Sequence, residues 1–60
     1  MKLYSISRTN SELQQQAYGL HVALNSLPQE TTKIENRSQD EIWAFDENGK
    51  LIATINEVTA

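Results

Sequence analysis

Few residues of this 60-residue chain have the type and spacing needed for catalysis. The single histidine, His21, has no serine or aspartate at a spacing typical of a catalytic dyad or triad. Carboxylates adjoin each other at Asp40-Glu41 and at Asp46-Glu47. General acid catalysis needs a carboxyl group whose pKa is raised by an apolar pocket, but these pairs lie where we expect strand ends and a turn in water. We therefore expect no enzymatic activity.

Metal, cofactor and substrate sites are not predicted either. Cysteine is absent, which excludes a thiolate zinc site, a disulfide framework and a cysteine nucleophile. Asp46, Asn48 and Gly49 partly match a calcium loop, but an alanine stands two residues before Asp46, and Glu57 is misplaced for the closing ligand. No glycine-rich phosphate loop occurs. We expect no metal, no cofactor and no small-molecule substrate.

The composition indicates a small globular domain. Hydrophobic residues make up 38% of the chain, and the formal net charge is −3. The longest unbroken apolar run, Ile42 to Phe45, is far too short to span a membrane. The first residues include no apolar stretch of the kind found in secretory signals. These observations predict one cytoplasmic domain over residues 1–60.

The clearest periodic pattern predicts a helix over about residues 11–26. Capping-box residues near Ser11 favour its start, and Pro28 favours its end, because the residue before a proline avoids helical geometry. Gly19 falls inside this helix, at an expected cost of about 1 kcal/mol relative to alanine. Five apolar residues recur at spacings of four and three and form one narrow stripe: Leu13, Ala17, Leu20, Leu24 and Leu27.

Two β-rich runs around the turn sequence DENGK predict a hairpin over residues 41–58. A two-residue Asn48-Gly49 turn would pair Phe45 with Ile52. A three-residue loop with a left-handed Gly49 would pair Phe45 with Leu51. We prefer the three-residue loop, because a single buried face fixes the register of a strand more firmly. That face would gather Trp43, Phe45, Leu51, Ala53 and Ile55.

The fold class expected from these elements is α+β. Residues 2–7 favour a short strand, and residues 31–36 form either a strand anchored by Ile34 or an irregular linker. One amphipathic helix (about 11–26) would pack on a three- or four-stranded, mainly antiparallel sheet that ends in the C-terminal β-hairpin (41–58). The leucines of the helix would cover the hairpin face that carries Trp43 and Phe45.

Two apolar surfaces would remain outside this core, and they predict a protein-interaction or regulatory module. Tyr18 and Val22 would be neighbours on a second helix face, flanked by Gln15. Ile42 and Ile52 would lie on the second face of the hairpin, where an apolar patch invites a partner. A chain this short without disulfides gains stability from association. We therefore expect a homodimer that also binds another, unidentified protein, or a structural subunit of a larger assembly.

An alternative hypothesis is a nucleic-acid-binding accessory protein. Four basic residues of the N-terminal half would make the contacts: Lys2, Arg8, Lys33 and Arg37. Residues 40–60, however, hold one lysine against five acids, a balance of −4. Such an acidic end repels phosphate backbones, so binding to nucleic acid is the weaker hypothesis.

Overall fold

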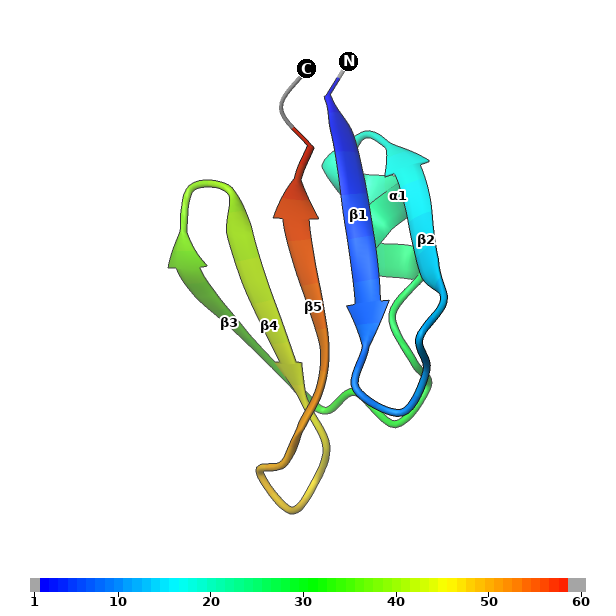
Figure 1. Cartoon of the computed structure of the whole chain (residues 1–60). Helices are drawn as coiled ribbons and strands as arrows, with labels where there is room; N and C mark the ends of the chain where they lie inside the picture. The colour runs from blue at the N-terminus through cyan, green and yellow to red at the C-terminus, as the bar shows by residue number, and fades with distance from the viewer. Residues whose placement is uncertain (1, 59–60) are drawn as a thin grey trace.

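The computed structural model, which describes residues 2–58, is a five-stranded antiparallel sheet with one short helix (Figure 1). The elements are β1 (Leu3–Arg8), β2 (Gln14–Tyr18), α1 (Leu20–Asn25), β3 (Lys33–Ser38), β4 (Glu41–Phe45) and β5 (Leu51–Glu57). The strand order is β2-β1-β5-β4-β3, so the first and last strands pair in the middle and β2 and β3 form the edges. The α+β class is confirmed, with five strands where three or four were expected.

The helix is much shorter than predicted, and its expected first half is a strand. Gly19 adopts φ 89° and ψ 135°, which ends β2 and starts α1. Such a positive φ is readily adopted only by glycine, so this residue breaks the helical periodicity rather than lying within it. Residues 14–18 instead pair along β1, with Tyr4 opposite Ala17. The predicted helix over 11–26 is therefore wrong before Leu20.

The C-terminal hairpin is confirmed together with its loop. Phe45 pairs with Leu51, and Gly49 has φ 79°, as the three-residue loop requires. The amide of Asp46 donates to the carbonyl of Lys50 at 3.0 Å and closes the turn. The Asp46 carboxylate accepts hydrogen bonds from the backbone amides of Asn48 and Lys50, both at 2.9 Å. Local turn chemistry therefore sets this part of the register.

A β-bulge directly after the turn reverses the predicted faces of β5. The register changes between the Phe45–Leu51 pair and the Ala44–Ala53 pair, which leaves Ile52 as an extra residue on β5. The carbonyl of Ile52 accepts the backbone amide of Thr9 at 3.0 Å. Because a slip of one residue moves every later side chain to the opposite face, the predicted grouping of Trp43 and Phe45 with Ile55 is wrong.

The core lies between α1 and one face of the sheet, which we call the helix side. Its buried hydrophobic residues are Tyr4, Ile6, Ala17, Ala23, Ile42, Ala44, Ala53 and Ile55. Leu24 and Leu27 pack partly against this cluster. Leu13 and Leu20 do not belong to it, since they are 82% and 39% exposed. The predicted leucine stripe therefore contributes only its C-terminal half to the core.

The segment left open between strand and linker forms an edge strand. β3 covers Lys33–Ser38 and pairs with β4, with Ile34 opposite Ala44. A register shift between Asn36 and Ser38 marks a bulge. Ile34 is 47% exposed, so this strand is held by its backbone pairing more than by a buried side chain. No helix among residues 2–58 is long and apolar enough to cross a membrane.

Candidate functional site

The face of the sheet opposite α1, which we call the open face, carries side chains that do not belong to the core. Directly opposed residues of antiparallel strands share a face, so the pairing places polar side chains in rows across β2, β1, β5 and β4. One row contains Gln16, Ser5, Asn56 and Glu41, and the next contains Gln14, Ser7 and Thr54. The middle of the open face is therefore polar.

One end of the open face is apolar. Trp43, Phe45 and Leu51 lie together there, and we call this group the aromatic corner. The two ring centroids are 6.3 Å apart with an interplanar angle of 50°, a tilted arrangement within the favourable range for aromatic pairs. All three side chains are half-buried. Trp43 and Phe45 thus lie outside the helix-side core, to which Tyr4 belongs.

A guanidinium group covers the indole of the aromatic corner. The Cζ atom of Arg37 lies 4.0 Å from the centroid of Trp43, which is cation–π geometry. The same guanidinium donates to the Glu35 carboxylate at 2.8 Å. The indole Nε1–H of Trp43 is buried and has no acceptor. The corner therefore combines two tilted aromatic rings, one cation and a buried indole N–H without an acceptor.

The four basic residues of the nucleic-acid hypothesis do not form one patch. Lys33 and Arg37 project from β3 beside the aromatic corner, since Lys33 pairs with Phe45. Lys2 and Arg8 lie six residues apart along the first strand segment, which spans about 20 Å of extended chain. They belong to the helix side, because Arg8 is opposite the buried Ala53. The structure brings two of the four basic residues together with aromatic rings and separates the other two from them.

The five predicted interface residues also divide. Tyr18 and Val22 are 63% and 52% exposed, but Tyr18 lies on β2, so the two are not neighbours on one helix face. Gln15 is exposed on the same edge strand. Ile42 is only 6% exposed and belongs to the core, so its assignment to an open hairpin face is wrong. Ile52 is half-buried at the bulge.

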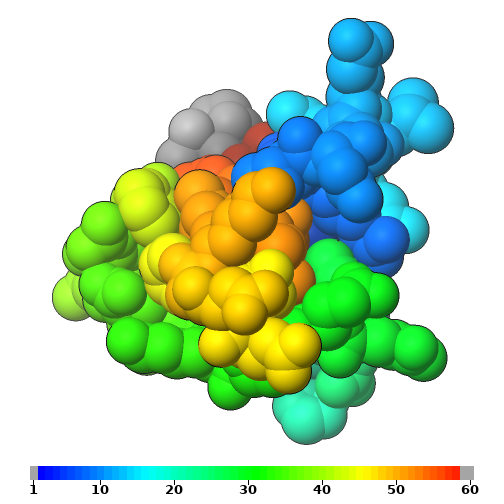
Figure 2. All heavy atoms as spheres, turned by 90° about the horizontal axis from the view of Figure 1, so that it is seen from below, coloured from blue at the N-terminus to red at the C-terminus, as the bar shows by residue number. Residues whose placement is uncertain are grey.

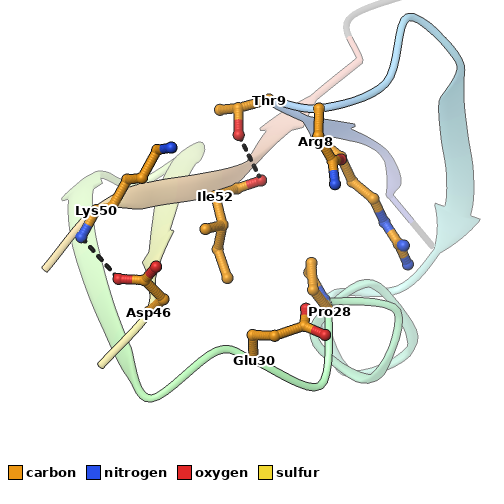
Figure 3. A pocket seen from close by; sticks show the side chains of 8 residues that line it. Arg8, Thr9, Pro28, Glu30, Asp46, Lys50 and Ile52 are labelled. Atoms are coloured by element: carbon orange, nitrogen blue, oxygen red, sulfur yellow. Dashed lines mark hydrogen bonds between the residues drawn. The ribbon is translucent and has the colours of Figure 1, made fainter. Parts of the chain in front are cut away.

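A hollow of about 300 Å³ lies beside the bulge (Figure 3). Its rim holds two cations, Arg8 and Lys50, and two carboxylates, Glu30 and Asp46. Several of its polar groups already have partners in the fold. Arg8 donates to the carbonyl of Ser26 at 3.3 Å, and the Asp46 carboxylate accepts two backbone amides of the turn. These contacts hold the loops in place and occupy part of the polar groups that line the hollow.

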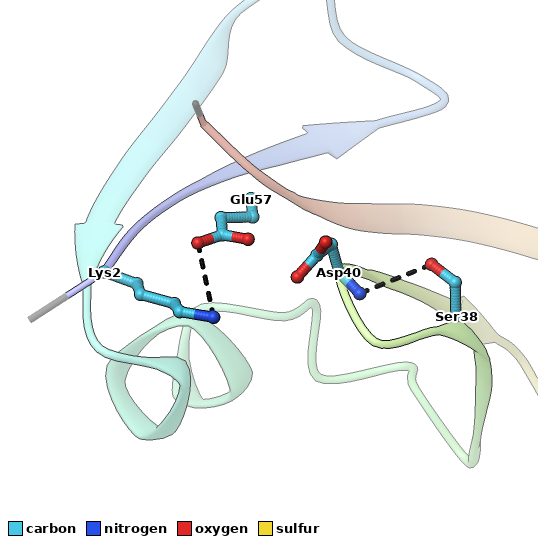
Figure 4. A network of polar contacts seen from close by, with 4 residues as sticks. All are labelled: Lys2, Ser38, Asp40 and Glu57. Carbon is cyan, nitrogen blue, oxygen red and sulfur yellow. Dashed lines mark hydrogen bonds and ion pairs between the residues drawn. The ribbon is translucent and has the colours of Figure 1, made fainter. Parts of the chain in front are cut away.

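Two carboxylates, those of Glu57 and Asp40, lie near Lys2 at the other end of the sheet (Figure 4). The Nζ atom of Lys2 lies 3.5 Å from a carboxylate oxygen of Glu57. The Glu57 charge, with a smaller contribution from Asp40, raises the pKa of Lys2 above its ordinary value. The Lys2 side chain is exposed to water, so this is a surface ion pair that neutralises one of the basic residues.

The residues considered for catalysis or metal binding belong to three separate places: His21 lies on α1, Asp46 and Asn48 lie in the hairpin turn, and Asp40 and Glu57 lie side by side at the other end of the sheet. His21 is exposed to water. Among residues 2–58, no group of three or more histidine, aspartate or glutamate side chains is placed to hold a metal ion. Two surfaces remain as candidates: the aromatic corner, where Arg37 covers Trp43, and the edge strand β2, whose side chains are mostly exposed.

The comparisons with known proteins provide no homology argument. No family model, no curated protein and no solved structure matches this chain. The sequence predicted Trp43, Phe45 and Leu51 on one face of the hairpin, but it placed that face in the core under the helix. The bulge puts Ala53 and Ile55 on the other face, which is the one that is buried.

Proposed function

We propose that this chain is a non-catalytic protein-interaction module that acts as a homodimer. The observation that carries the proposal is the division of the apolar side chains. Four of the eight buried hydrophobic residues described are alanines, and the largest fully buried side chains are two isoleucines, Ile6 and Ile55. Tryptophan, phenylalanine and several leucines lie outside this core. These large apolar side chains outside the core favour a surface that binds another protein chain.

Self-association follows from the small size of the core. A 60-residue domain buries only about 60% of the surface that its unfolded chain exposes, so its stability margin is narrow. A second copy that binds only the folded chain adds to stability through mass action. The chain has no cysteine to supply a disulfide instead. We therefore propose that dimerisation adds to the narrow stability margin of the folded chain.

The aromatic corner is the surface we propose for a different protein partner. Tryptophan and arginine are enriched among residues that dominate binding energies, and charged residues such as lysine are commoner at the rim. Trp43, Arg37 and Lys33 reproduce that combination on one exposed face. A partner carboxylate would compete with Glu35 for the Arg37 guanidinium, next to the apolar rings. The proposed partner is thus a protein segment with an acidic and an apolar side chain.

Nucleic-acid binding is the second candidate function. Two cations, Lys33 and Arg37, lie next to the rings of Trp43 and Phe45, which favours this function. In proteins that bind single-stranded nucleic acid, aromatic rings stack on the bases and cations contact the phosphates. With only two cations near the rings, the logarithm of the binding constant should fall with the logarithm of salt at a slope of about −1.4, twice the ~0.7 expected per phosphate. Titration of the Trp43 fluorescence with a single-stranded oligonucleotide at several salt concentrations measures that slope. Absence of any change at low salt rules this candidate out.

The experiment for the proposed function is the absolute mass in solution by light scattering. Samples should span about 1 µM to about 1 mM, the range in which weak to moderate dimers form. Twice the chain mass of 6.8 kDa is 13.6 kDa, and we expect the mass to approach this value as concentration rises. A mass of 6.8 kDa at every concentration refutes the homodimer.

A further inference from the structure

The two edges of the sheet are protected very differently against pairing with another strand. β3 carries Lys33, Glu35 and Arg37 and contains a bulge, which are devices that keep exposed edges from pairing. β2, with the sequence QQQAY, has no charge and no proline, and its register with β1 is unbroken. The β2 edge is therefore left without the usual protection.

The backbone groups that β2 directs outward can be assigned from the ladder. The amide of Gly19 donates to the carbonyl of Lys2 at 2.7 Å, which makes this a hydrogen-bonded pair. Bonded and non-bonded pairs alternate in an antiparallel ladder, so Gln15 and Ala17 also bond to β1. The N–H and C=O groups of the alternate residues Gln14, Gln16 and Tyr18 consequently point away from the sheet.

The exposed apolar side chains gather at the same edge. Six large hydrophobic residues described in the structure are exposed, and four of them lie within residues 13–22: Leu13, Tyr18, Leu20 and Val22. The helix α1 packs against β1 and β2 and so lies at this side of the sheet (Figure 1). Figure 2 shows the light-blue segment that joins β1 to β2 projecting from the rest of the molecule. Unpaired backbone and exposed apolar surface therefore coincide.

We propose that the β2 strands of two copies pair antiparallel about a twofold axis at Gln16, which joins two sheets into one of ten strands. This inference rests on the proposed homodimer and assigns its contact. In this register Gln16 faces Gln16 of the second copy, and Gln14 faces Tyr18. All three outward-facing residues then exchange both of their backbone hydrogen bonds, which gives six bonds across the axis.

The same register accounts for the exposed leucines. Opposite residue numbers add up to 32, so Leu13 comes opposite Gly19 of the second copy. Leu20 of the second copy directly follows that Gly19 and is the first residue of its α1, so it comes next to Leu13. Leu13 also lines a hollow of about 390 Å³ with Ile6 and Gln15 at this edge. The dimer covers Leu13 and Leu20 with each other, whereas the aromatic corner stays free for a different protein.

A charge exchange at the axis tests this register. Gln16→Lys places two ammonium groups directly opposite each other, and like charges in that position destabilise strand pairing. We expect the dimer dissociation constant of Gln16→Lys to rise about fivefold or more, and that of Gln16→Glu to rise similarly. An equimolar mixture of the two variants should form a heterodimer at least as tight as the wild-type dimer.

The matched control adds the same charge at the protected edge. Asn36→Lys on β3 should leave the mass at every concentration unchanged. A second variant, Gln16→Pro, removes an outward N–H that does not bond to β1, so it should give a folded monomer. Circular dichroism of each variant separates loss of the dimer from loss of the fold.

The outcomes distinguish this inference from the proposed function. If the wild type is monomeric at all concentrations, the proposed homodimer is refuted, and the proposed pairing of two β2 strands is refuted with it. If the wild type dimerises but the Gln16 variants dimerise equally well, the homodimer holds and the β2 contact is wrong. Monomers from Asn36→Lys with intact dimers from Gln16→Lys would move the contact to β3 and overturn this assignment.

Discussion

Replacing Gly19 by alanine distinguishes the observed strand-to-helix turn from a continuous helix. In the structure Gly19 has φ 89° and ψ 135°, close to a backbone region that is essentially confined to glycine. The residue cannot relax easily, because its amide donates to Lys2 and its carbonyl accepts the amide of Ala23 at 3.1 Å. Forcing an L-residue into such a conformation costs about 1–3 kcal/mol. Gly19→Ala should therefore destabilise the protein.

The continuous helix predicts a change of the opposite sign. Inside a helix over residues 11–26, the same substitution would stabilise the protein by about 1 kcal/mol. Each kcal/mol shifts the midpoint of thermal unfolding by about 4–8 °C in a domain of this size. Thermal unfolding followed by circular dichroism at one fixed protein concentration measures the shift. A higher Tm for Gly19→Ala would refute the strand-to-helix turn.

Gly49→Ala is the matched control for this substitution. Gly49 also has a positive φ, 79°, but no heavy atom lies within 4 Å of an added Cβ. Only the left-handed backbone is then penalised, at about 1–2 kcal/mol. Asparagine tolerates this conformation, so Gly49→Asn should recover part of the loss. The corresponding Gly19→Asn should recover little, because its ψ lies outside the left-handed helical region.

Three further predictions concern the core, the turn and the ion pair. Ile55→Val, which removes one buried methylene, should lower the free energy of unfolding by about 0.5–1.5 kcal/mol in urea titrations, while Ile34→Val on the exposed edge should change it by less than about 0.5 kcal/mol. Asp46→Ala should destabilise by about 1–2 kcal/mol, because two backbone amides of the turn lose their acceptor, and the isosteric Asp46→Asn should retain much of the stability; equal midpoints for both variants would contradict this role. Since Glu57 raises the pKa of Lys2, their interaction stabilises the protein at neutral pH and is lost as the pH rises through the raised pKa. In Glu57→Gln that alkaline loss should be smaller, and identical pH profiles would show that the ion pair contributes nothing.

The parts of the fold that depend on local chemistry were predictable from the sequence. The turn residues from Asp46 to Lys50 specify a three-residue loop with Gly49 left-handed, and the structure has that loop. The strand at the N-terminus and the α+β class followed from β-branched and aromatic content. These features depend on neighbours within a few residues, so a sequence pattern is enough to identify them.

The helix and the faces of the hairpin were not predictable, because long-range pairing decides both. The spacing of Leu13, Ala17 and Leu20 fits a helix, yet residues 14–18 gain a full ladder of hydrogen bonds with β1. Ile52 is the extra residue of the bulge, and its carbonyl accepts hydrogen bonds from the amide and the hydroxyl of Thr9, more than forty residues earlier in the chain. No local signal in LIATI reveals that contact.

The candidate site was predicted in part for the same reason. Exposure of Tyr18, Val22 and Gln15 agrees with the expected surface, although they reach it from a strand and a short helix. Ile42 belongs to the core because, beyond the bulge, it pairs with Ile55 and shares the buried helix-side face with it. The aromatic corner came to the open face through that same bulge. One irregular residue thus exchanged the predicted buried and exposed sides.

Amide hydrogen exchange along β2 tests the central claim, that two copies pair through this edge, most directly. The amides of Gln14, Gln16 and Tyr18 point outward, whereas that of Ala17 bonds to β1. In exchange measurements by nuclear magnetic resonance at low and high protein concentration, the three outward amides should become protected as the dimer forms. Ala17 should be protected at both concentrations. If the mass doubles while Gln16 and Tyr18 exchange equally fast at both concentrations, the dimer does not form through β2.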